Sequence, residues 1–103
     1  MLKQKSVHHN LFTQVSTQIE SLEAKLSEFK YERTILLSER EVILSLKDQS
    51  TTIEECDYWE LELIIRDHLL ETNMAELSRL KQEFYYEKQK QEFLKNVLTK
   101  TCS

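Results

Sequence analysis

Residues 11–29 read LFTQVSTQIESLEAKLSEF, and their apolar side chains recur at alternating steps of three and four residues. This stripe consists of Phe12, Val15, Ile19, Leu22, Leu26 and Phe29. Its spacing places one narrow apolar seam along an α-helix, which is the pattern of a coiled coil. The stretch therefore predicts a long helix that packs against at least one other helix.

The composition extends this prediction to the whole chain. None of the 103 residues is Gly or Pro, the two residues that most often build tight turns. Hydrophobic residues make up 40% of the chain and charged residues 31%, which suits helices that bury one stripe and expose the rest to solvent. We expect an all-α chain of long helices with few reversals, and one domain at most.

The apolar pattern widens in the middle of the chain. Leu36 and Ile43 continue the seam, but the same register places Arg33, Arg40 and Lys47 at seam positions. Further apolar residues lie off the seam and cover more than half of the helix circumference: Ile35, Leu37, Val42, Leu44 and Leu46. Residues 53–70 show a similar wide arc, in which we assign Trp59, Leu63 and Leu70 to the seam. A helix that is apolar over so wide an arc usually has several neighbours, so we expect the coiled coil to widen into a multi-helix bundle around residues 35–70.

The narrow stripe returns in the last third of the chain. Its seam residues are Leu77, Leu80, Phe84, Leu94 and Leu98, with Glu87 and Gln91 at the two polar seam positions. We expect frayed ends at residues 1–10 and 100–103, a first coiled-coil helix over 11–47 and a second helical segment over 53–99.

Residues 48–52 form the candidate break between these segments. Thr51 and Thr52 each precede a Glu by three residues, which is the spacing of a helix-capping box. We expect a continuous or gently interrupted rod. The alternative is a turn that folds helices 11–47 and 52–99 into a hairpin.

The sequence offers little for catalysis or metal binding. His8 and His9 are adjacent, so on a helix they point about 100° apart, and His68 is remote from both in sequence. Cys56 and His68 are twelve residues apart, or about 18 Å along one helix. The Glu-x-x-His step of di-iron bundles does not occur. We expect no enzyme activity, no cofactor, no metal site and no small-molecule substrate.

Charge and aromatic residues indicate a protein partner. Residues 20–76 carry 15 acidic and six basic residues, and the net charge of the chain is −4, which argues against general nucleic-acid binding. The apolar runs are too short for membrane insertion. Two cysteines without a paired motif are typical of a reduced intracellular protein, cytoplasmic, cytoskeletal or nuclear. We assign a candidate docking patch for a basic partner to Glu54, Glu55, Asp57, Tyr58 and Trp59.

These features predict a coiled-coil scaffold subunit that pairs with itself or with another coiled-coil chain. In composition the chain resembles helical subunits of kinetochore, spindle-pole, centrosome and synaptonemal assemblies, and this resemblance implies a role in cell division or the cytoskeleton. One alternative is a regulatory helical hairpin that captures a basic partner helix on residues 54–65. Another is a vesicle tether or adaptor rod.

Overall fold

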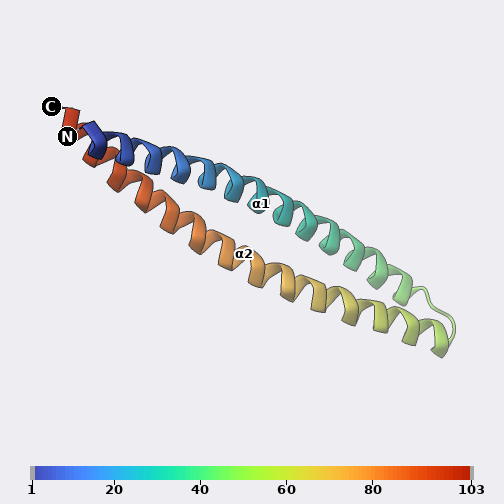
Figure 1. The fold of residues 1–103 in the computed structure, drawn as a ribbon. Helices are drawn as coiled ribbons and strands as arrows, with labels where there is room; N and C mark the ends of the chain where they lie inside the picture. The colour runs from blue at the N-terminus through green and yellow to red at the C-terminus, as the bar shows by residue number, and fades with distance from the viewer. Residues whose placement is uncertain (1, 103) are drawn as a thin grey trace. The chain divides into compact units, whose positions relative to one another are not determined.

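Two long α-helices make up the chain (Figure 1). The computed structural model describes the backbone of residues 2–102 and the side chains of residues 7–100. Helix α1 spans Leu2–Asp48 and helix α2 spans Ile53–Cys102, and no strand occurs among the described residues. This confirms the prediction of an all-α, long-helix fold. The expected helical segments were 11–47 and 53–99, and both helices extend beyond these bounds, into the ranges that were expected to fray. Residues 1 and 103 lie outside the described residues.

Two compact units divide the chain, and each takes one segment from each helix. The turn unit is Ser27–Ser78, which contains the end of α1, the connection and the start of α2. The terminal unit combines Met1–Leu26 with Arg79–Ser103. Each unit is therefore a pair of helical segments, which are neighbours in sequence in the turn unit and distant in sequence in the terminal unit.

The turn unit is an antiparallel helical hairpin, so the expectation of a continuous or gently interrupted rod is wrong. Arg40 on α1 bonds to Asp67 on α2, whereas Lys47, one heptad later on α1, pairs with Glu60, one heptad earlier on α2. Partners that run in opposite directions along the two helices require an antiparallel pair. The rod expectation rested on the missing Gly and Pro, but this reversal needs neither, since no described residue has a positive φ angle.

Serine and threonine side chains build the connection between the helices. At the end of α1 the Ser50 hydroxyl donates to the carbonyl of Leu46 at 3.0 Å, and the Ser50 backbone N–H donates to Lys47. At the start of α2 the Glu55 backbone N–H donates to Thr52 Oγ1 at 3.2 Å, which makes Thr52 the N-cap. The Glu55 carboxylate in turn accepts from the Thr51 backbone N–H at 3.4 Å. Side chains of the connection thus bond to backbone groups at the two helix ends, which have no partner within their own helix.

The terminal unit has its own apolar core. Val15 and Ile19 from α1 are buried with Leu94 from α2, and Phe12 and Phe84 pack against them. At the edge of this core the Gln91 side chain donates to Ser16 Oγ at 3.2 Å, across the two helices. The seam predicted from residues 11–29 therefore packs against the second helix of the same chain.

Candidate helix-docking surface

The sixteen predicted seam residues lie between the chain's own two helices. Ten are buried and six are half-buried. Leu22 retains only 2% of its exposure and Leu80 only 1%, without any second chain. The expectation that this seam must find another chain therefore differs from the structure, in which α2 covers it. The buried residues are Val15, Ile19, Leu22, Leu26, Leu36, Ile43, Leu63, Leu77, Leu80 and Leu94, and the half-buried ones are Phe12, Phe29, Trp59, Leu70, Phe84 and Leu98.

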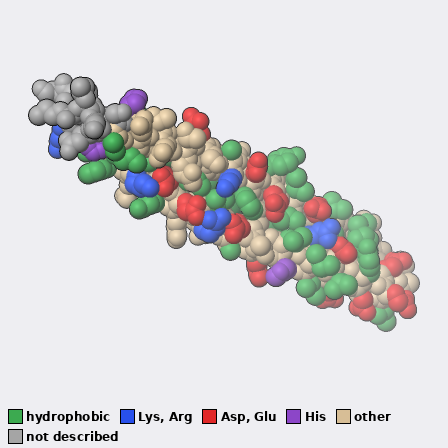
Figure 2. Space-filling view, in the orientation of Figure 1, with side chains coloured by type: hydrophobic (Ala, Val, Ile, Leu, Met, Phe, Trp, Pro, Cys, Tyr) green, Lys and Arg blue, Asp and Glu red, His purple; other side chains and the backbone are tan. Residues whose placement is uncertain are grey.

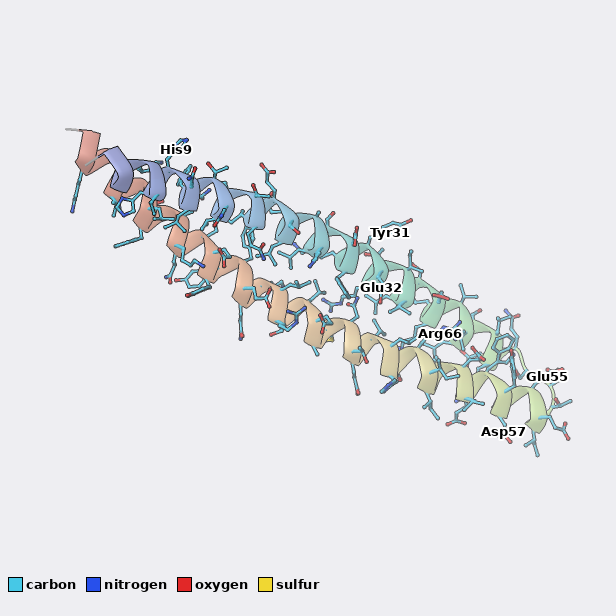
Figure 3. All side chains as sticks on the ribbon, in the orientation of Figure 1. His9, Tyr31, Glu32, Glu55, Asp57 and Arg66 are labelled. Carbon is cyan, nitrogen blue, oxygen red and sulfur yellow. The ribbon has the colours of Figure 1, made fainter. Side chains whose placement is uncertain are left out.

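Charged side chains occupy several seam positions of the turn unit, and Arg40, Lys47 and Arg66 form ion pairs there. Arg66 lies on α2 at a seam position (Figure 3). Its guanidinium group bonds to Glu62 on the same helix and to Glu39 on α1 at 3.4 Å. Arg40 bonds to Asp67 at 2.8 Å on the other side of the seam. These ion pairs are partly exposed, so each contributes little to stability. They favour this alignment of the two helices, because another alignment would separate the charged partners.

Asn73 is the one buried polar residue among the described side chains, with 1% exposure. Its Nδ2 atom donates to the carbonyl of Phe29 at 3.0 Å, which links α2 to α1. Its Oδ1 atom is buried without a hydrogen-bond partner. A buried amide at a coiled-coil seam position costs stability and fixes register, and Asn73 has the burial and the cross-helix bond for that role.

An apolar surface remains exposed on one side of the turn unit. On α1, residues 35, 39, 42 and 46 follow steps of four, three and four, so they form one stripe; on α2, residues 58, 62, 65 and 69 do the same. Each stripe contains one Glu, and Arg66 bonds to both of these carboxylates. The other six residues form what we call the turn-proximal surface, and all are exposed: Ile35, Val42, Leu46, Tyr58, Ile65 and Leu69.

The turn-proximal surface is hollowed rather than flat. One groove runs along Ile35, Val42 and Leu46 and reaches Trp59 on α2. A second groove, nearer the connection, shares Leu46 and Trp59 with the first and also contacts Tyr58. Figure 2 shows hydrophobic side chains gathered over the turn unit, interleaved with acidic ones. A groove of this kind, between two helices, fits the apolar stripe of a further helix.

The predicted docking patch lies at the connection end of this surface. Tyr58 and Trp59 meet edge to face with ring centroids 4.9 Å apart, and Trp59 is half-buried whereas Tyr58 is exposed. Glu54 and Glu55 line the second groove, whereas Asp57 is exposed and does not line it (Figure 3). The patch therefore divides, and four of its five residues border one groove.

Sequence reasoning recognised the residues of the turn-proximal surface as apolar but did not assign them to a site. Val42, at 58% exposure, is an example, since it was treated only as part of a wide apolar arc. The signal was present in the spacing: Val42 and Ile35 are seven residues apart on the same flank of the seam, and Tyr58 and Ile65 repeat that spacing. The two polar seam positions of α2, Arg66 and Asn73, were also not recognised as part of the seam, because they interrupt its apolar run.

The terminal unit carries an apolar groove of its own. It is lined by Leu11 on α1 and by Tyr86 and Phe93 on α2, all three exposed. The ammonium group of Lys90 lies 5.0 Å from the centre of the Tyr86 ring and 3.2 Å from a Glu87 carboxylate oxygen. This groove therefore joins aromatic side chains to a lysine.

The residues considered for chemistry are not brought together. Cys56 is a half-buried free thiol at the start of the α2 seam, and His68 is exposed on the same helix. Within the described side chains, His, Cys, Asp and Glu form no group of three or more that could hold a metal ion. Among the described residues, neither helix has a stretch long and apolar enough to cross a membrane.

The sequence matches no protein-family model, and neither a curated protein nor a solved structure is significantly similar to it.

Proposed function

We propose that the chain is a non-enzymatic scaffold subunit that assembles by docking further helices on its turn-proximal surface. The observation that carries this proposal is the division of its apolar residues. The seam is covered within the chain, whereas six apolar side chains in two parallel stripes stay exposed next to it. Exposed apolar side chains that gather along two adjacent helical stripes are typical of an interaction site. Docked helices would supply the multi-helix bundle expected around residues 35–70.

A second candidate function is a regulatory module that binds a basic partner helix. The groove at the connection favours it, because Glu54 and Glu55 border the groove beside Tyr58 and Trp59. Carboxylates next to exposed aromatic rings suit a partner that presents lysine or arginine beside an apolar stripe. This module would be a helical monomer at all concentrations, whereas a self-assembling scaffold would not.

The setting we propose for the scaffold is a cell-division or cytoskeletal assembly, such as a kinetochore, spindle pole, centrosome or synaptonemal complex, in the cytoplasm or nucleus. The support is compositional: a helical chain rich in Glu, Lys and Gln, without Gly or Pro. A vesicle tether or adaptor would share this composition. The partners we propose are other copies of the chain or another coiled-coil protein.

Light scattering after size-exclusion chromatography, combined with circular dichroism, tests the scaffold function. The wild-type chain is expected to form oligomers that dissociate on dilution while its helicity stays constant, because the hairpin covers its own seam. The double variant Ile35→Gln/Val42→Gln removes two exposed apolar groups without changing charge, and Gln is a good helix former. It is expected to stay monomeric and equally helical.

The matched control is Leu37→Gln/Leu44→Gln, which changes two residues with the same spacing on the other flank of the seam. Both are exposed, Leu44 at 37%. This control is expected to assemble like the wild type. A wild-type chain that stays monomeric at all concentrations, or two double variants with the same effect, would refute assembly through the turn-proximal surface.

A further inference from the structure

The two units carry opposite charge. The turn unit, Ser27–Ser78, contains 13 acidic and five basic residues, so its net charge is −8. The terminal unit contains five acidic and nine basic residues, so its net charge is +4. Three of the five bases of the turn unit, Arg40, Lys47 and Arg66, already pair with its own acids. The charge of the turn unit therefore favours a basic surface as its partner.

Each unit also exposes an apolar groove beside its seam. In the turn unit this is the turn-proximal surface. In the terminal unit it is the groove bordered by Leu11, Tyr86 and Phe93, where Phe93 is 67% exposed and Lys90 lies over Tyr86. One chain thus carries one apolar groove on an acidic unit and another on a basic unit. Within the terminal groove itself Lys90 is paired with Glu87, so the positive charge comes from the rest of that unit.

We propose that the turn-proximal surface binds the terminal unit of a second copy of this chain. The inference rests on the scaffold function proposed above and names the surface that the scaffold binds. Contact between two turn units would bring together two units of net charge −8, whereas contact between a turn unit and a terminal unit joins units of opposite net charge. When both copies make the contact at once, the pair has two-fold symmetry and two equivalent contacts.

Complementation between two variants tests the pairing. Variant A is Ile35→Gln/Val42→Gln, which damages the turn-proximal surface and leaves the terminal unit intact. Variant B is Tyr86→Gln/Phe93→Gln, which damages the groove of the terminal unit and leaves the turn unit intact. Both pairs of positions are seven residues apart and exposed, and neither variant changes the formal charge. Tyr85→Gln, on the same helix but outside the groove, is the control for variant B.

Sedimentation velocity measures association of each variant alone and of an equimolar mixture in which one variant carries a fluorescent label. Variants A and B are each expected to associate at least tenfold more weakly than the wild type. The mixture is expected to form dimers at concentrations where each variant alone is monomeric, because A supplies an intact terminal unit and B an intact turn unit. Raising the salt from 0.05 to 0.5 M is expected to weaken wild-type association, since added salt screens opposite charges.

Three results would overturn the proposal. If variant B associates like the wild type, or if the mixture is no stronger than its components, the contact is not between a turn unit and a terminal unit. In both of these cases a weakened variant A still supports a scaffold that uses the turn-proximal surface. If the wild type is monomeric throughout, both this inference and the self-assembly in the proposed function are wrong. Circular dichroism of each variant confirms that lost association is not lost folding.

Discussion

Replacing Asn73 by Leu is expected to stabilise the hairpin. Asn73 is 1% exposed, donates one cross-helix hydrogen bond to Phe29 and leaves its Oδ1 atom without a partner. Removing that buried acceptor recovers about 1–3 kcal/mol, whereas the lost hydrogen bond costs about 0.5–1.5 kcal/mol. A buried Leu side chain adds roughly 1.5–3 kcal/mol of apolar burial. Some of this gain is offset by the fit of Leu into a site shaped for Asn, so we expect a net stabilisation of about 2 kcal/mol.

Urea unfolding followed by circular dichroism at low protein concentration measures this change. With a denaturant slope near 2 kcal/mol per M, Asn73→Leu is expected to raise the urea midpoint by about 1 M. Asn96→Leu is the control, because Asn96 is exposed on the same helix and its replacement should change stability by less than about 0.5 kcal/mol. If Asn73→Leu lowers the midpoint, the cross-helix bond matters more than the unpaired oxygen, and the reasoning is refuted.

Two further changes test the packing and the connection. Leu80→Ala is expected to destabilise the chain by about 2–4 kcal/mol, because Leu80 is 1% exposed and its truncation leaves a cavity. Leu61 is exposed, so the control Leu61→Ala should cost under about 1 kcal/mol. Equal urea midpoints for the two variants would contradict the burial of Leu80. Thr52→Ala is expected to lower stability by about 1 kcal/mol through loss of the N-cap, measured by thermal unfolding. Thr51→Ala retains the backbone N–H that bonds to Glu55 and should change little, so a larger effect at Thr51 would show that the cap is misplaced.

The seam itself was readable from sequence because its spacing is strict. Steps of three and four residues continue from Phe12 to Phe29, and in the structure these residues line the contact between helices. Periodicity reports which face of a helix is buried, but not which helix buries it. We therefore predicted the stripe correctly but expected another chain to cover it, whereas the second helix of the same chain does so.

The sequence also contained a sign of the hairpin. It lay in the relative positions of the two seams along the chain and not in turn residues. The α1 seam continues through Lys47 and Ser50, and the same rhythm would next use Glu54 and Asp57. The α2 seam instead begins at Cys56 and is displaced by two residues, or about 200° around a helix. One continuous helix would thus carry its two seams on nearly opposite faces. Glycine and proline counts could not reveal this, because Ser50 and Thr52 make the reversal with hydrogen bonds of their own.

The wide apolar arcs were the part of the site that sequence could show only incompletely. Ile35 and Leu37 lie on opposite flanks of the seam residue Leu36. In the structure α2 covers Leu36 and leaves one exposed flank on each side, and the sequence alone does not show this division.

In residues 53–70 the apolar seam positions Trp59, Leu63 and Leu70 were assigned correctly, but Arg66, which lies at the seam position between the last two, was not. Its partners, Glu39 and Glu62, are distant in sequence from one another, so their shared ion pair could not be inferred.

The central claim is that one chain covers its own seam, and an intramolecular distance tests it most directly. Spin labels at Thr17 on α1 and Glu92 on α2, both exposed, are introduced into a chain whose cysteines are replaced by serine, and the labelled chain is diluted into excess unlabelled protein. Packed helices lie about 8–10 Å apart, so pulsed electron paramagnetic resonance is expected to give a distance below about 30 Å including the label tethers. A continuous helix would separate the same residues by roughly 110 Å, at about 1.5 Å per residue. Absence of the short distance in the diluted sample would contradict the hairpin and the division between a covered seam and an exposed docking surface.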